Sequence, residues 1–110
     1  MIIQTNEFSD VYDKLEAQYM ILKKDYEDFE NLLLKNPEIG DLIEGTGGLR
    51  KTRLKSSSKG KRGGFRVCYC DVPEKRRIYL VSIFAKNEKE NLSQAEKKLL
   101  KGLIDILKKE

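Results

Sequence analysis

The sequence predicts an α+β fold in which helices pack against an antiparallel sheet. Three observations carry this prediction. Apolar residues recur at helical spacing over 8–33. Two later runs, 65–70 and 78–84, are rich in the β-branched and aromatic residues that strands favour. Finally, Ser93 and Glu96 have the spacing of a capping box and open a second helical pattern.

The N-terminal part predicts a short strand at Ile2 and Ile3, followed by two helices. Helical spacing begins at Phe8, and we expect a break or bend at 16–18 that separates a short helix from a longer one. Asn36-Pro37 ends the second helix, because proline disfavours helical geometry in the residue before it. Aromatic residues at this spacing could form a stacking surface for bases, but we interpret them as core.

The remaining chain predicts three strands and one helix. A glycine-punctuated loop at 38–48 precedes a strand at 49–55, and 56–64 has no apolar residue, which is typical of an exposed connection. The turn at 71–77, which contains proline, joins the last two strands. The final helix has one broad apolar face, formed by Leu99, Leu100, Leu103, Ile104 and Leu107. The expected order over 1–110 is β-α-α-β-β-β-α in one domain, with about four strands and the helices on one face.

Positive charge is concentrated in one stretch of the chain. The net charge is +4, yet residues 45–70 hold eight Lys and Arg and no acidic residue, so the rest of the chain carries −4. Six of the eight glycines also lie there. Lysine, arginine and closely approaching backbone N–H groups are the usual partners of phosphate, so the stretch predicts binding to a polyanion such as nucleic acid.

Other site chemistries are disfavoured by composition. Cys68 and Cys70 are two apart on one predicted strand, a poor geometry for a mutual disulfide, so we expect two free thiols packing a sheet in the cytoplasm. Histidine is absent, which disfavours a zinc site, and we expect neither metal nor cofactor. We see neither a secretory signal nor an apolar stretch long enough to span a membrane. The basic loop lacks the lysine-serine or lysine-threonine ending of a P-loop.

The basic residues divide by the element that carries them. Lys51, Arg53 and Lys55 alternate along one strand, and Arg66 lies within the next, where packing can hold a guanidinium rigid. The alternative interpretation of Arg66 is an ordinary strand arginine that faces solvent or forms an ion pair.

The basic residues could also support cleavage of RNA by its own 2′-hydroxyl. That reaction needs a base, an acid and stabilisation of the charge on the phosphorane. Clustered lysines can have a lowered pKa, and arginine can stabilise the charge.

The sequence resembles the RelE/HigB class of bacterial type II toxins, and especially its HigB-like branch. The likeness covers most of the chain and is most specific in three segments, GTGGLRK, KGKRGGFRV and AKNEKENLS. It implies a RelE-like fold with a curved antiparallel sheet, and a toxin that cleaves mRNA in the ribosomal A site without metal, by 2′-hydroxyl attack. It also implies a cognate HigA-like helix-turn-helix antitoxin, through which the pair acts on operator DNA.

The resemblance also implies site residues. Candidates for catalysis are Lys51, Arg53, Arg66 and Lys86, the last matching the segment after the final strand. Candidates for RNA binding are Arg50, Lys55, Lys59, Lys61 and Arg62. The chain departs from RelE near Asn87, where RelE has an arginine, and near Ser93, where it has a tyrosine. The general acid and base therefore do not transfer, and Lys86 or Lys61 could substitute.

We therefore predict a ribosome-dependent mRNA endonuclease toxin. Lys51, Arg53 and Lys61 would hold RNA phosphates, Arg66 would stabilise the transition state and Lys86 would transfer a proton. Two alternatives stay open. A ParE-like toxin would poison DNA gyrase and need no nuclease residues. A non-catalytic nucleic-acid-binding domain would only neutralise phosphates, with salt-sensitive and sequence-independent binding.

Overall fold

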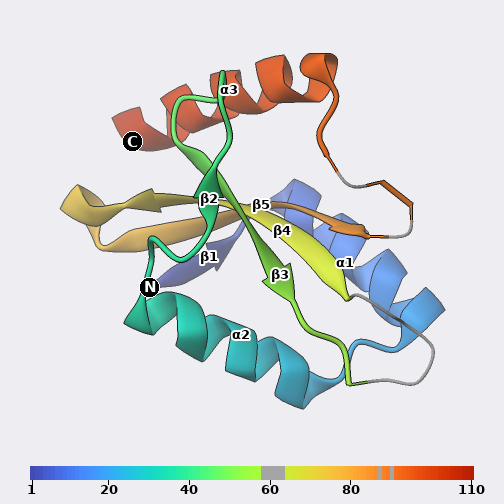
Figure 1. Cartoon of the computed structure of the whole chain (residues 1–110). Helices are drawn as coiled ribbons and strands as arrows, with labels where there is room; N and C mark the ends of the chain where they lie inside the picture. The colour runs from blue at the N-terminus through green and yellow to red at the C-terminus, as the bar shows by residue number, and fades with distance from the viewer. Residues whose placement is uncertain (58–63, 87, 90) are drawn as a thin grey trace.

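The computed structural model describes residues 1–57, 64–86, 88–89 and 91–110. These residues form one mixed sheet of five strands in the order β1-β5-β4-β3-β2, three α-helices and a 3-10 turn (Figure 1). The elements are β1 (Ile2–Gln4), α1 (Asn6–Tyr19), α2 (Lys23–Lys35), β2 (Asp41–Leu42), β3 (Leu49–Leu54), β4 (Phe65–Val72), η1 (Pro73–Lys75), β5 (Arg77–Ala85) and α3 (Gln94–Lys109). The α+β class, the three helices and the antiparallel β3-β4-β5 meander agree with the sequence prediction.

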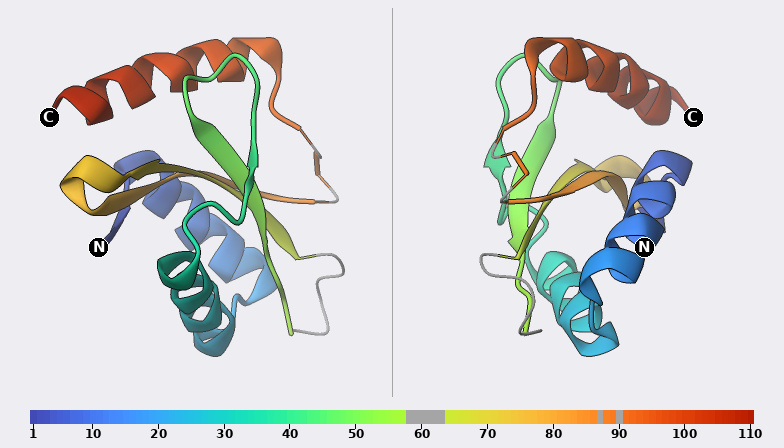
Figure 2. Two further views of the ribbon diagram at one scale, coloured as in Figure 1. Left: turned by 60° about the vertical axis from the view of Figure 1, so that its left-hand side comes forward. Right: turned by 90° about the vertical axis from the view of Figure 1, so that its right-hand side faces the viewer.

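The helices cover both faces of the sheet, so the prediction that they share one face was wrong. Helices α1 and α2 lie on one side, and α3 lies on the other (Figures 1 and 2). Strand β4 shows the reason: Phe65, Val67 and Tyr69 join the core beneath α1 and α2, while Cys68 and Cys70 join the core beneath α3. Both sets of side chains are apolar, so a strand of this kind is buried on two faces and needs a helix on each.

The sheet is larger than predicted and is not wholly antiparallel. β1 pairs parallel to β5, with Ile2 opposite Ile78 and Gln4 opposite Leu80. Antiparallel pairing with β3 makes a strand of Asp41 and Leu42, which lie inside the expected loop. The strand at Ile2 and Ile3 was predicted, but its parallel pairing depends on a segment more than 70 residues away and leaves no local pattern. β2 has only two residues, too few to show the alternation typical of a strand.

The break between the first two helices lies at Met20 to Leu22, later than the predicted 16–18. Met20 adopts the left-handed conformation, with φ of 57°, and its N–H donates to the carbonyl of Glu16 at 2.8 Å. Leu22 precedes α2 without a side-chain cap. The end is therefore made by backbone geometry alone, at a methionine that carries no helix-ending signal.

The start of α3 agrees with the sequence prediction in detail. The Ser93 hydroxyl accepts a hydrogen bond from the backbone N–H of Glu96 at 3.1 Å, and the Glu96 carboxylate accepts one from the N–H of Ser93 at 2.9 Å. The apolar face of α3 then buries Leu100, Ile104 and Leu107 against the sheet. Within the described residues, no helix has both the length and the apolar character that a membrane crossing requires.

Both cysteines are free and buried, as predicted. Burial raises the pKa of the Cys68 thiol to about 12, against the opposing effect of the nearby Lys51 and Lys89 ammonium groups. Burial also raises the pKa of Cys70. Such thiols stay protonated at neutral pH, so they pack the sheet and do not act as nucleophiles.

Gly64 is required where the chain returns to the sheet at the start of β4. Its φ is +65°, and a Cβ there would lie 2.3 Å from the carbonyl oxygen of Leu54. We expect Gly64→Ala to lower the free energy of unfolding by about 1–3 kcal/mol, measured by urea denaturation. Gly102→Ala is the matched control: it meets open space in α3 and should raise stability by about 0.5–1 kcal/mol. An unchanged urea midpoint for Gly64→Ala would contradict the requirement for glycine at position 64.

Candidate functional site

Three of the predicted catalytic residues lie on one face of the sheet, the face that α3 covers in part. Side chains alternate along a strand, and Leu49 and Cys68 belong to the core beneath α3, so the side chains of Lys51, Arg53 and Arg66 leave their strands on that same side. In the register, Lys51 is directly opposite Cys68 and Arg53 is directly opposite Arg66. We call Lys51, Arg53 and Arg66 the cationic cluster.

The cationic cluster places two guanidinium groups on neighbouring strands. Arg66 also lies opposite Phe84 of β5, so Arg53, Arg66 and Phe84 form one row across three strands. Arg53 is exposed and Arg66 is half-buried, with an Nη1 donating to the carbonyl of Phe65 at 3.5 Å. Like charges directly opposite each other destabilise a sheet. An anion bound between the two arginines would make their electrostatic contribution favourable, so the row is suited to a phosphate.

Lys51 is fixed by a contact that crosses to the connector before α3. Its Nζ donates to the Oδ1 of Asn91 at 2.8 Å. Lys51 is half-buried as a residue, its ammonium is exposed, and its position on β3 is two residues from Arg53. A lysine held in this way can present its remaining N–H groups to a phosphate oxygen with little loss of side-chain entropy.

Lys86 lies beside the end of the same hairpin. It is exposed and follows Ala85, the last residue of β5, and its backbone N–H donates to the carbonyl of Gly64 at 3.4 Å. That contact brings Lys86 to the start of β4, two residues from Arg66. Asn87, its neighbour in the family match, lies outside the described residues.

The predicted RNA-binding residues are distributed over different places. Lys59, Lys61 and Arg62 lie outside the described residues. Lys55 is exposed after β3 and lines a pocket of about 310 Å³ against α2. Arg53 lines the same pocket, so its long side chain reaches α2 although its Cβ starts on the face that α3 covers. Asp25 also lines it and accepts two 2.7 Å hydrogen bonds from Ser57, which fixes the chain that leaves β3.

Arg50 is not brought to the cationic cluster. It alternates with Lys51 and so projects on the opposite side, where its Nη1 donates to the carbonyls of Glu38 at 3.2 Å and Gly40 at 2.7 Å. The buried Tyr69, directly opposite Arg50, accepts from the N–H of Gly40 at 2.8 Å. Arg50 therefore holds the loop before β2 in place.

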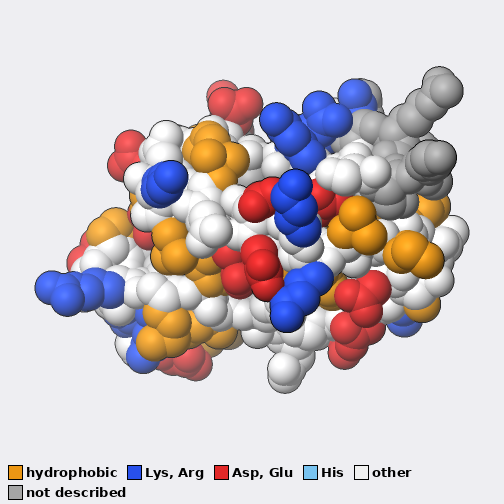
Figure 3. Space-filling model, turned by 90° about the horizontal axis from the view of Figure 1, so that it is seen from below, with side chains coloured by type: hydrophobic (Ala, Val, Ile, Leu, Met, Phe, Trp, Pro, Cys, Tyr) orange, Lys and Arg blue, Asp and Glu red, His pale blue; other side chains and the backbone are white. Residues whose placement is uncertain are grey.

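The two sides of the sheet differ in charge. Helix α3 carries five basic and two acidic residues, so it adds to the positive charge of the cationic cluster. Helix α1 carries four acidic residues and one basic residue. On the side where α2 lies, acidic and basic side chains are interspersed with apolar ones (Figure 3). An approaching polyanion is therefore attracted to the α3 side.

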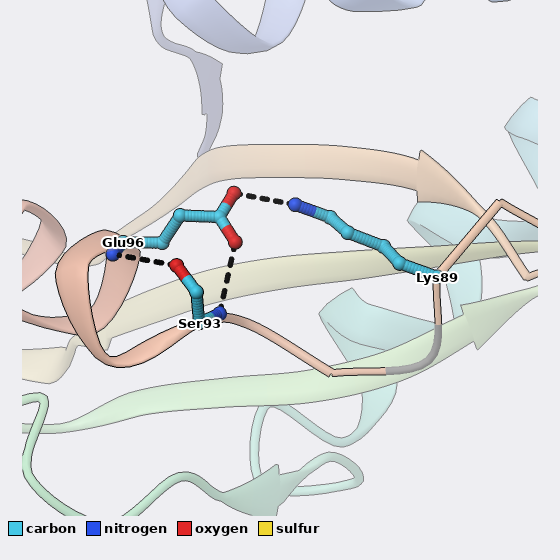
Figure 4. Close-up of polar contacts among 3 residues, drawn as sticks. All are labelled: Lys89, Ser93 and Glu96. Carbon is cyan, nitrogen blue, oxygen red and sulfur yellow. Dashed lines mark hydrogen bonds and ion pairs between the residues drawn. The ribbon is translucent and has the colours of Figure 1, made fainter.

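Sequence reasoning missed the contacts made by the connector. Lys89 forms an ion pair with Glu96 (Figure 4). Asn91 accepts a hydrogen bond from Lys51. The capping box marked Glu96 as a helix start, but a connector without periodicity gives no sign of which way Lys89 or Asn91 points. Among the described residues, no group of three or more His, Cys, Asp and Glu side chains is arranged to hold a metal ion.

Comparison with solved structures shows the same fold. The chain matches the toxin in the intact E. coli RelBE toxin–antitoxin complex with a TM-score of 0.57 and 18% identity, over 77% of this chain and 94% of that one. It matches free E. coli RelE with two arginine-to-alanine substitutions with a TM-score of 0.59 and 16% identity, over 96% of each. The isolated E. coli RelE toxin in a P21 crystal form gives 0.56 and 18%, over 94% and 97%.

The sequence itself matches a protein family over most of its length. Residues 33–109 match the family described as the RelE toxin of the RelE/RelB toxin–antitoxin system. The matched range contains the cationic cluster, α3 and every strand of the sheet except β1. The chain therefore belongs to the RelE toxin family.

Proposed function

We propose that this toxin stops translation by cleaving mRNA on the ribosome, in the A site. The observation that carries the proposal is the cationic cluster, Lys51, Arg53 and Arg66, on one sheet face of a RelE-family chain. Two strands hold these side chains in register, so they can act on one phosphate group together. A sheet is a more rigid support for such a site than a loop.

The proposed reaction is attack of a 2′-hydroxyl on the adjacent phosphorus. The new bond joins the 2′-oxygen to phosphorus, and the bond from phosphorus to the 5′-oxygen breaks. The 2′-hydroxyl loses a proton to a base, and the departing 5′-oxygen gains one, which leaves a 2′,3′-cyclic phosphate and a 5′-hydroxyl. Arg66 stabilises the charge on the phosphorane oxygens, and Lys51 and Arg53 bind phosphates. Lys86 takes part in proton transfer.

The proposed roles need no metal ion, because arginine and lysine supply the positive charge at the phosphorus. Lys55, Lys59, Lys61 and Arg62 add contacts to the RNA backbone. The ribosome supplies the alignment of the mRNA that a small open sheet cannot give alone.

We further propose that a cognate antitoxin neutralises this toxin. The E. coli relative occurs in a complex with an antitoxin, which supports a partner of that kind for this chain. The HigB-like segments of the sequence favour a HigA-like helix-turn-helix protein, and through it the complex would bind operator DNA. The toxin would act in the cytoplasm, where the ribosomes are.

The test is to map mRNA 5′ ends shortly after induction of the toxin. We expect new ends within translated regions, and the same ends when purified toxin is added to programmed ribosomes. Naked mRNA should stay intact. Intact mRNA together with induction of DNA damage signalling would instead indicate gyrase poisoning. Salt-sensitive binding to naked RNA, without cleavage on ribosomes, would indicate a binding domain alone.

A further inference from the structure

A fourth cation lies beside the cationic cluster, on the connector between β5 and α3. The Nζ of Lys89 is 4.9 Å from the centroid of the Phe84 ring. Phe84 is directly opposite Arg66 on the neighbouring strand. The ammonium of Lys89 therefore lies over Phe84, the β5 member of the row that also holds Arg53 and Arg66, near the end of β5.

Glu96 holds this ammonium in place (Figure 4). One carboxylate oxygen of Glu96 pairs with the Nζ of Lys89, and the other accepts from the backbone N–H of Ser93 at 2.9 Å. The hydrogen bond from Lys89, followed by the one from Ser93, lowers the pKa of Glu96. Because the capping box fixes Glu96 at the first turn of α3, the anion is anchored to the helix and Lys89 is the movable partner.

This ion pair differs from the other one in the described part of the chain. Lys23 and Glu27 on α2 are 3.8 Å apart, with side chains 90% and 57% exposed. Lys89 and Glu96 are 36% and 39% exposed. Lys89 also contacts an aromatic face, and Lys51, Lys89 and Glu96 are all close enough to the Cys68 thiol to influence its pKa. The pair is thus part of the surroundings of the cationic cluster.

We propose that Lys89 contacts an RNA phosphate beside the one held by Arg66, and that Glu96 is a positioning residue for it. The inference rests on the proposed function, in which RNA lies on this face. An ammonium has three N–H donors, and the bond to Glu96 uses one, so the others can reach a phosphate oxygen. If a phosphate draws Lys89 away, Glu96 keeps the Ser93 N–H and the N-terminus of α3 as partners.

The first test measures binding of a single-stranded RNA oligonucleotide against salt concentration. Lys89→Met keeps an apolar stem over Phe84 and removes the charge. We expect the slope of log affinity against log salt to become shallower by about 0.7, the value for one phosphate contact on a single strand. Lys89→Arg should keep the wild-type slope. Lys23→Met, which also removes an ion-paired lysine, is the matched control and should keep it too.

The second test measures single-turnover cleavage on programmed ribosomes. Lys89→Met should lower the maximal rate about 10- to 100-fold and raise the toxin concentration needed for half-maximal rate. Glu96→Gln removes a nearby negative charge, so the half-saturating toxin concentration should fall, and the maximal rate should fall because Lys89 is less well positioned. A purely structural role for Glu96 would not improve binding while it lowers the maximal rate. Adding Glu96→Gln to Lys89→Met should lower the rate no further, because Glu96 acts through Lys89.

The outcomes separate this inference from the proposed function. A wild-type salt slope and rate for Lys89→Met would overturn the inference, as would equal losses for Lys89→Met and Lys23→Met. A loss that follows the melting temperature, and that Lys89→Arg does not restore, would also overturn it. If wild-type toxin cleaves nothing on ribosomes, the proposed function fails, while a shallower salt slope for Lys89→Met would still support the phosphate contact.

Discussion

Replacing Arg66 by alanine is expected to lower mRNA cleavage on the ribosome by about 10²–10³-fold. Arg66 is the central member of the row that runs from Arg53 to Phe84, and strands on both sides fix its backbone. A preorganised cation at the phosphorane oxygens stabilises the transition state more than the ground state, so its loss should reduce the maximal rate. Single-turnover cleavage on programmed ribosomes measures the rate, and growth after induction gives a second readout.

The control for this variant is an arginine at the far end of the hairpin. Arg77 begins β5 opposite Val72, and its Nη1 donates to the hydroxyl of Tyr79 at 3.0 Å. Arg77→Ala should leave cleavage unchanged. Arg66→Lys should recover only part of the rate, since an ammonium cannot form the two parallel hydrogen bonds of a guanidinium. A folded Arg66→Ala protein that cleaves and arrests growth as the wild type does would remove Arg66 from the site.

The parts of the fold that could be predicted from sequence are those with a local chemical signal. Pro37 ended α2 where expected, because a proline constrains its neighbour in any fold. Ser93 and Glu96 fixed the start of α3, because both halves of the capping box lie within four residues. Met20 had no such signal, because methionine neither favours the left-handed conformation nor caps a helix, yet α1 ends there at a φ of 57°. Cys68 and Cys70 mark the second buried face of β4, because buried thiols behave as small apolar side chains that need a helix above them.

The site divides in the same way. Lys51 and Arg53 could be grouped because a period of two puts them on one face of a strand, and Arg66 could be added because its strand follows next in the chain. The same alternation puts Arg50 on the other side, where it binds carbonyl groups. The connector contacts could not be predicted, because Lys89 and Asn91 reach the sheet through loop geometry, which leaves no periodic pattern.

Charge repulsion inside the cationic cluster leads to a second large effect, in which stability and activity change in opposite directions. Arg53→Gln removes one of two arginines that occupy directly opposite positions of β3 and β4. We expect the free energy of unfolding to rise by about 0.2–1 kcal/mol, because a like-charge pair is relieved. Cleavage on ribosomes should fall about 10- to 100-fold, because the same charge binds a phosphate. Thermal unfolding and single-turnover cleavage measure the two effects.

Salt and a neighbouring lysine identify the cause of such a change. If repulsion between Arg53 and Arg66 is responsible, the gain in stability should shrink at about 1 M salt, where the Debye length falls to about 3 Å. Lys55→Gln removes an equal charge just beyond the end of β3, outside the paired register, and should give a smaller gain in stability.

A stability loss for Arg53→Gln would show that Arg53 supports the fold. A gain in stability with full activity would show that phosphate binding does not need the paired arginines, and the site would then lie nearer Lys51 and Lys89. Opposite shifts would mean that the sheet tolerates repulsion here because RNA relieves it, which is the behaviour expected of a surface selected to bind phosphate.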